Sequence, residues 1–146
     1  MECVSFGLAR TEIHRLYNFN LIHMEKGLTF TSKDTVRVEN IAKTVGSGNL
    51  EVFATPAMAA LMENAAMNAV AGELPEGSTT VGSLIEITHN RPSGLGETVS
   101  ATATLEEADG RKLTFSVVAS DSKGIIGEGK HIRYVVDCER FMSKVK

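Results

Sequence analysis

Residues 55–71, TPAMAALMENAAMNAVA, decide the fold of this chain. They predict a helix with Thr55 as the N-cap, Pro56 at the first helical position and Gly72 just past the end. The interior of the helix contains no Lys or Arg. Its strongly polar side chains are Glu63, Asn64 and Asn68. Because a helix with so little charge has no clear solvent face, we expect it to be buried on most sides.

Strand-like stretches surround this helix in the sequence. Alternation and β-branched residues predict strands over residues 29–38, 79–89, 97–107, 112–120 and 125–136. Tight turns at Asp109-Gly110 and at residues 122–124 make the last three strands antiparallel neighbours. We therefore predict an α+β domain whose antiparallel sheet wraps around one central helix, which is the hot-dog fold.

The chain divides into a short appendage and one domain. Residues 1–24 show no sustained period, and Glu25-Lys26-Gly27 separates them from residues 25–146, which we assign to the hot-dog domain. Met24 is our expected biological start. A sheet of this kind leaves exposed edges, and pairing with a second copy would cover one of them. We expect a homodimer at least, with a tetramer as the alternative, and sites shared between subunits.

Composition excludes several classes of function. The chain has 146 residues and a net charge of −3, which provides no overall positive field for nucleic acid or an anionic membrane. Cys3 and Cys138 lie near opposite ends and form no C-x-x-C pair, so we expect a cytoplasmic protein. No apolar run is long enough to span a bilayer, and charges interrupt residues 1–15 where a signal peptide would be apolar, so we expect the chain to be soluble and uncleaved. The histidines and cysteines lack metal-ligand spacing, and no metal is expected.

Glu63 is the first candidate for chemistry. Its neighbours three and four residues away are all apolar: Ala59, Ala60, Ala66 and Met67. Burial would penalise the charged form and prepare the carboxylate to act as a base or nucleophile. The alternative is a structural Glu that pairs with a cation or a backbone amide.

Thr55 and His89 are the other two candidates. The Thr55 hydroxyl lies at the positive end of the helix, where it would stabilise developing negative charge; the alternative is an ordinary cap. His89 closes an alternating strand just before Asn90-Arg91-Pro92, a place suited to a base at a pocket mouth. The alternative is a structural or merely exposed histidine.

These residues also carry a family resemblance. Residues 51–55 (EVFAT), followed by Met58, Leu61-Met62-Glu63 and a Gly82-bearing strand that ends in Ile87-Thr88-His89, resemble the hot-dog thioesterases related to fluoroacetyl-CoA thioesterase. The resemblance covers roughly residues 27–145 and includes the late Gly129-Lys130-His131-Ile132-Arg133 run. It implies hydrolysis of an acyl-CoA thioester without a metal. It also implies no other cofactor, since the CoA belongs to the substrate.

The resemblance also implies roles for individual residues. Thr55, Glu63 and His89 would form the catalytic set, and Gly82 and Arg133 would bind substrate. The alternative for Arg133 is a surface salt bridge. Whether Glu63 attacks the thioester or acts as a base stays open.

One departure affects the expected substrate. The family enzyme has a phenylalanine-lined lid before EVFAT, whereas this chain has Gly46, Ser47, Gly48 and Asn49. We therefore expect a short or medium acyl-CoA in place of a fluorinated one. The alternatives are a hydratase or dehydratase on CoA esters, which leaves the thioester intact, and a non-catalytic acyl-CoA-binding module.

Overall fold

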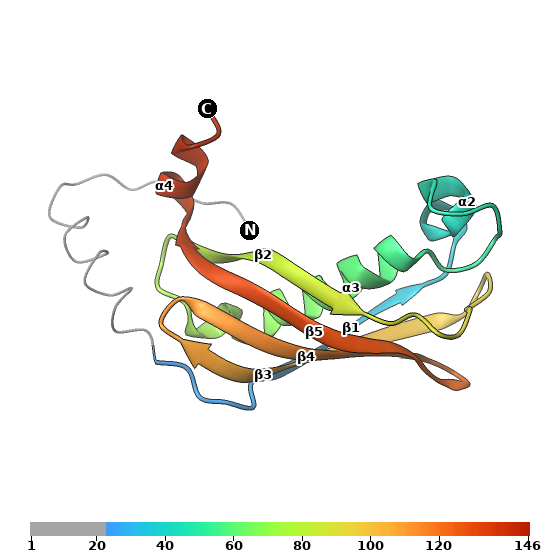
Figure 1. Ribbon diagram of the computed structural model, residues 1–146, viewed down its shortest axis with the longest axis horizontal. Helices are drawn as coiled ribbons and strands as arrows, with labels where there is room; N and C mark the ends of the chain where they lie inside the picture. Colours follow the sequence, from blue (N-terminus) through green and yellow to red (C-terminus); the bar gives the residue numbers. More distant parts are fainter. Residues whose placement is uncertain (1–22) are drawn as a thin grey trace, which may run out of the picture.

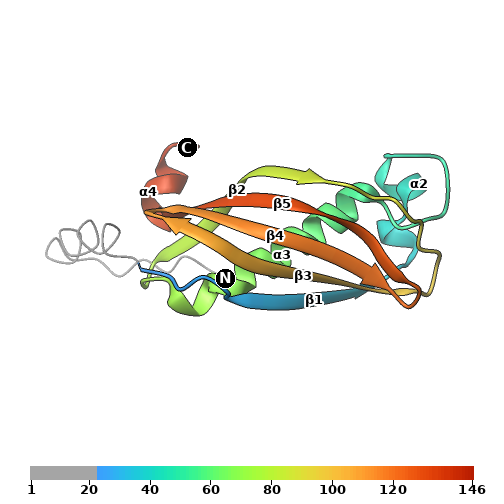
Figure 2. The ribbon, with the colours of Figure 1, turned by 60° about the horizontal axis from the view of Figure 1, so that its bottom comes forward.

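The computed structural model describes residues 23–146, so most of the predicted appendage lies outside the described residues. Five strands form one antiparallel sheet in the order β1-β3-β4-β5-β2. Their bounds are β1 (Thr29–Thr35), β2 (Ser78–Ile87), β3 (Thr98–Asp109), β4 (Lys112–Asp121) and β5 (Gly124–Asp137). The sheet curls around the long helix α3 (Thr55–Val70), which confirms the predicted arrangement (Figures 1 and 2).

The core lies between α3 and the concave face of the sheet. Val99, Ala101, Ala103 and Leu105 alternate along β3 and are fully buried, as the two-faced pattern predicted. They meet the buried face of α3, which contributes Met58, Met62, Ala65, Ala66 and Val70. Met24, the last residue of the predicted appendage, is also part of this core.

The helix is less enclosed than predicted. α3 packs chiefly on β3 and β1 and only slightly on β2. Thr55, Ala60 and Asn64 are exposed in the single chain. The expectation that α3 is buried on most sides is therefore wrong for one copy, because the sheet covers a single face of the helix.

The first turn of α3 also differs from the prediction. Ala54 is the N-cap residue, Thr55 begins the helix, and no side chain caps the helix start. The assignment of Thr55 as the cap is wrong by one position, because its hydroxyl bonds to a residue after β2. Past Val70 the chain continues into a short 3₁₀ turn, η2 (Ala71–Glu73).

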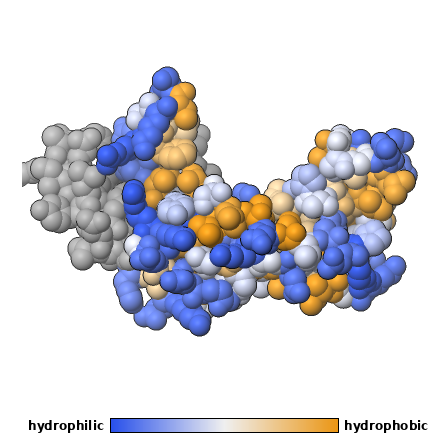
Figure 3. All heavy atoms as spheres, viewed as in Figure 1, coloured by the Kyte–Doolittle hydropathy of each residue, from blue (hydrophilic) through white to orange (hydrophobic). Residues whose placement is uncertain are grey.

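Short elements stand at both ends of the sheet. η1 (Val38–Asn40) and α2 (Ala42–Val45) precede α3, and α4 (Cys138–Ser143) follows β5. In Figures 1 and 3, α2 and α4 rise at opposite ends of one face, which is hollowed between them and has an apolar band on its floor. Within residues 23–146, no helix is long and apolar enough to span a membrane.

Candidate active site

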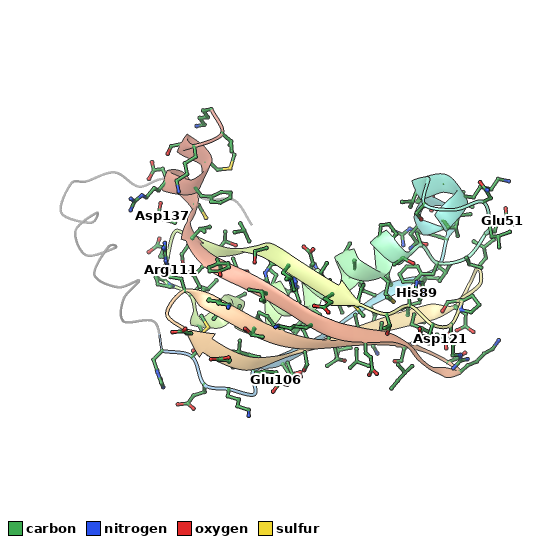
Figure 4. All side chains as sticks on the ribbon, viewed as in Figure 1. Glu51, His89, Glu106, Arg111, Asp121 and Asp137 are labelled. Carbon is green, nitrogen blue, oxygen red and sulfur yellow. The ribbon has the colours of Figure 1, made fainter. Side chains whose placement is uncertain are left out.

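Thr55 and His89 come together at the start of α3. β2 ends at Ile87, and His89, two residues later, lies beside the helix start (Figure 4). Thr55 Oγ1 and His89 Nδ1 are 2.7 Å apart, a hydrogen-bond distance. The other ring nitrogen, Nε2, is buried and has no hydrogen-bond partner among the described residues. The structure thus joins two of the three predicted catalytic residues and leaves one ring nitrogen available.

The surroundings of His89 favour its neutral form. Burial lowers the pKa of His89, and a backbone hydrogen bond with Arg91 opposes the change. At neutral pH one ring nitrogen therefore carries a lone pair. A neutral imidazole oriented by a hydroxyl is equipped to accept a proton from water.

Glu63 lies further along α3 and faces the sheet. Its Oε2 atom is 3.6 Å from Nη1 of Arg133 on β5. The Glu63 side chain is 43% exposed, whereas that of Arg133 is 7% exposed. The expectation of a carboxylate enclosed by its own helix is therefore wrong: Glu63 reaches across to a buried cation and stays open on its other side.

Arg133 is held from several directions. Its Nε donates to Thr80 Oγ1 at 2.8 Å, and its Nη2 donates to the Thr80 carbonyl at 2.9 Å. Its Nη1 is 3.2 Å from Nε2 of His131. Burial lowers the pKa of Arg133 and the Glu63 charge raises it, although a guanidinium stays charged at any working pH. Most of its donors bind protein groups, so the guanidinium is rigidly placed.

Gly82 makes this cluster sterically feasible. It pairs with Arg133 in the β2–β5 register. A Cβ atom at position 82 would lie 3.2 Å from His131 Cε1, 3.3 Å from Glu63 Oε2 and 3.5 Å from Arg133 Nη1. The three side chains therefore gather against a stretch of backbone that carries no side chain. Both predicted substrate-binding residues, Gly82 and Arg133, lie at Glu63.

The two groups are separated within one chain. Thr55 and Glu63 are eight residues apart on one helix, which at about 1.5 Å per residue places them ~12 Å apart along its axis. Within residues 23–146, Glu63 has its ion pair with Arg133 and no hydrogen bond to Thr55 or His89. Along the helix axis the two groups are therefore separate, and the described residues show no direct contact between them.

His131 is a buried member of the cluster that sequence reasoning missed. It is 0% exposed, and its Nδ1 lies 2.7 Å from the Leu84 carbonyl. The β5 alternation contains the signal, because His131 shares a face with Arg133 and with buried Val135. A histidine on the inward face of a central strand requires polar partners.

Other features of the described chain lie away from this site. No group of three or more His, Cys, Asp or Glu side chains in residues 23–146 is arranged to bind a metal. A shallow polar depression is lined by residues that include Glu97 and Asp121, and it contains none of the predicted site residues. Chemistry is therefore concentrated around α3.

Comparison with known proteins identifies the family. The model of the fluoroacetyl-CoA-specific thioesterase family matches residues 36–139. Fluoroacetyl-CoA thioesterase of Streptantibioticus cattleyicolor is 42% identical over 96 residues, which are 66% of this chain and 69% of that protein. A solved structure of the fluoroacetyl-CoA thioesterase FlK superposes with a TM-score of 0.79 at 35% identity, covering 84% of this chain and 96% of that one.

A hot-dog-like protein of Thermanaerovibrio acidaminovorans superposes with a TM-score of 0.77 at 26% identity, over 88% of this chain and 94% of that one. The five-stranded sheet, the central helix and the match to the family model all indicate the same fold. The chain therefore belongs to the fluoroacetyl-CoA-specific thioesterase family and is a thioester hydrolase with the hot-dog fold.

Proposed function

We propose that the protein hydrolyses a short or medium acyl-CoA to the free acid and CoA, using Thr55, Glu63 and His89. The observation that carries the proposal is the 2.7 Å contact between Thr55 Oγ1 and His89 Nδ1, with the second ring nitrogen unpaired. A mutant of FlK has been solved in complex with fluoroacetate and CoA, which supports a CoA ester as the substrate class.

A thioester suits these groups because its carbonyl is electrophilic and its thiolate leaves readily. His89 accepts a proton from water, and Thr55 orients the imidazole or stabilises the oxyanion at the positive end of α3. Glu63 acts in one of two ways. As a second base it assists the attack of water; as a nucleophile its oxygen bonds to the carbonyl carbon while the C–S bond breaks.

The covalent route leaves a mixed anhydride on Glu63 and releases CoA as the thiolate, which takes up a proton. Water then hydrolyses the anhydride and restores the carboxylate. Single turnover in ¹⁸O-labelled water separates the two routes. Label in Glu63 supports covalent attack, with water adding to the Glu63 carbonyl. Water adding to the acyl carbonyl of the anhydride labels the product acid alone, as direct hydrolysis does, so trapping of the anhydride with borohydride or hydroxylamine is the second readout. Absence of both the label in Glu63 and a trapped adduct rejects the covalent route.

The separation of ~12 Å leads us to place each site between two copies of the chain. In a two-fold dimer, Glu63 of one protomer meets the Thr55–His89 pair of its partner, and the same contact recurs symmetrically. Support comes from the exposed face of α3, which includes Thr55, Ala60 and Asn64, and from exposed Leu84 on the edge strand β2. The small side chains at Ala59 and Ala60, midway between the two groups, allow close approach of the helices.

Mixing two inactive variants tests the shared site. A Glu63→Gln chain and a His89→Ala chain, unfolded and refolded together, form mixed dimers in which one site holds both native groups. We expect about a quarter of the wild-type activity, since half of the dimers are mixed and each contains one intact site of two. Activity no higher than that of the separate variants would contradict the shared site.

The substrate class rests on the segment between α2 and α3. Residues 46–49 are exposed and contain no aromatic side chain, so they provide no dry aromatic gate. A thiol-release screen over acyl-CoAs of increasing length tests this. We expect turnover of several short and medium chains and no strong preference for fluoroacetyl-CoA. Absence of thiol release from every acyl-CoA would overturn the proposed function. Conversion of the acyl chain without free thiol, the thioester remaining intact, would indicate a hydratase or dehydratase.

A further inference from the structure

His131 is the buried titratable group that the proposed chemistry does not use. It lies on β5 opposite Ile85 of β2 and Phe115 of β4, and it is 0% exposed. A buried imidazole needs a polar partner for each nitrogen, because an unsatisfied one costs free energy. His131 has both: the Leu84 carbonyl at Nδ1 and the Arg133 guanidinium at Nε2.

These two partners determine the tautomer of His131. A carbonyl oxygen only accepts, so Nδ1 carries the proton that bonds to Leu84 at 2.7 Å. A guanidinium only donates, so Nε2 must hold a lone pair for Nη1 of Arg133 at 3.2 Å. Both conditions are met by one neutral form of the ring and by no other.

The surrounding charges agree with a neutral ring. Burial lowers the pKa of His131; the Leu84 carbonyl raises it, the Arg133 charge lowers it and the Glu63 charge raises it. Among the described residues, Arg133 of β5 and Glu63 of α3 supply the charges, while β4 contributes the Phe115 ring at 6.3 Å. A protonated ring would turn a second N–H toward Arg133 and break their hydrogen bond.

We propose that His131 is a positioning residue, whose neutral Nε2 fixes the Arg133 guanidinium so that Nη1 presents the Glu63 carboxylate to the substrate over Gly82. His131 does not touch the substrate and acts only through Arg133. Nη1 is the nitrogen that serves both His131 and Glu63, while Nε and Nη2 serve Thr80. The proposal rests on the proposed role of Glu63.

Two substitutions separate this role from a structural one. His131→Gln keeps an acceptor oxygen near the place of Nε2 and loses the bond to Leu84. His131→Asn keeps a donor near the place of Nδ1 and removes the acceptor for Arg133. Each variant loses one hydrogen bond, so both should unfold at similar denaturant concentrations, whereas only the Asn variant releases Arg133.

We expect kcat of the Asn variant to fall on the order of 10–10² fold, because a small displacement of a reacting group is costly, with KM changed little. The Gln variant should stay within about threefold of the wild type by the same argument. Equal kcat in the two variants, after correction for folded fraction, would overturn the proposal.

NMR of the protein without substrate tests the positioning role of His131 separately from the hydrolysis that the proposed function requires. ¹⁵N NMR of the wild-type dimer at neutral pH should show a neutral His131 ring protonated at Nδ1. It should also show separate Arg133 Nη signals, which merge in the Asn variant because the guanidinium then rotates. A proton on Nε2, or unchanged Arg133 signals in the Asn variant, would refute the positioning role even if hydrolysis is intact. Absence of hydrolysis with the expected spectra would refute the catalytic role of Glu63 instead.

Discussion

The start and the middle of α3 hold their polar groups in different ways. At the start, Thr55 and His89 share one hydrogen bond, and the remaining ring nitrogen is unpaired. In the middle, Arg133 is bonded to Thr80 and His131, and only Glu63 remains half exposed. The comparison separates two kinds of group. His89 and Glu63 keep atoms available for reaction, whereas Arg133 is engaged in hydrogen bonds that fix its position. The proposed reacting atoms are those with the fewest protein partners.

The largest expected effect comes from Glu63→Gln, which keeps the shape of the side chain and removes its charge. We expect thiol release to fall on the order of 10²–10⁴ fold, because a positioned base or nucleophile is lost. Because Arg133 is buried, loss of its ionic partner should also lower stability, so thiol release is compared at equal folded fraction. Glu76→Gln, at an exposed turn, is the matched control and should retain wild-type activity. Full activity in the Glu63 variant would refute the site assignment.

A smaller loss is expected at the start of α3. Thr55→Val preserves shape but removes the hydroxyl that orients His89. Because one hydrogen bond contributes about 1 kcal/mol, kcat should fall about fivefold.

Thr55→Ser restores the hydroxyl and serves as the control for this loss. It should recover most of the activity in the same thiol-release assay. If valine and serine behaved alike, the hydroxyl would have no part in the reaction.

Substitution of two glycines of the sheet, Gly82 and Gly129, should affect different properties: activity at the first position and stability at the second. In Gly82→Ala, the new Cβ lies 3.3 Å from Glu63 Oε2, so the carboxylate must shift by a few tenths of an ångström. We expect activity to fall about three- to tenfold while the melting temperature changes little. In Gly129→Ala, the new Cβ collides with the backbone at Glu86, so the fold itself should be destabilised by about 1–3 kcal/mol. Equal melting temperatures for the two variants would contradict this distinction.

Sequence patterns predicted the scaffold better than the site. Alternation placed the five strands within a few residues of their observed bounds, because the inward side chains of β3 and β4 obey a period of two. The short helices α2 and α4 escaped prediction, since four or six residues carry no period. Thr-Pro at a helix start fits either the cap or the first turn, and only the position of His89 decides between them.

The partners of Glu63 were beyond sequence reasoning for a different reason. Arg133 and His131 come close to Glu63 only because β5 pairs with β2 at Gly82 and α3 crosses the sheet there. Neither the register nor the crossing point is encoded in a local pattern. The alternation of β5 turns His131 inward but does not specify which helix residue it will meet.

The smallest expected effect concerns pH and stability. The pKa of His89 and that of His131 are both lowered in the folded protein from about 6.5, so the unfolded chain binds more protons just below that value. The free energy of unfolding should therefore decrease as pH falls from about 6.5 towards the folded pKa values. Above about 6.5 the stabilising contribution of the two neutral histidines is complete.

Urea denaturation between pH 5 and about 8 measures this dependence. His131→Gln removes one of the two titrating groups, so its stability should decrease less steeply in acid than that of the wild type. An identical slope in the two proteins would contradict the burial of His131 as a neutral ring.

Because Thr55 and Glu63 lie on one uninterrupted helix, α3 fixes the distance and the angle between their side chains. Inserting one alanine between them would rotate the carboxylate by about 100° away from the sheet. Inserting four would restore its direction approximately but displace it by ~6 Å. The number of residues between the two groups is thus constrained even where their identity is free. In the proposed dimer, a change in the length of α3 would inactivate both sites at once.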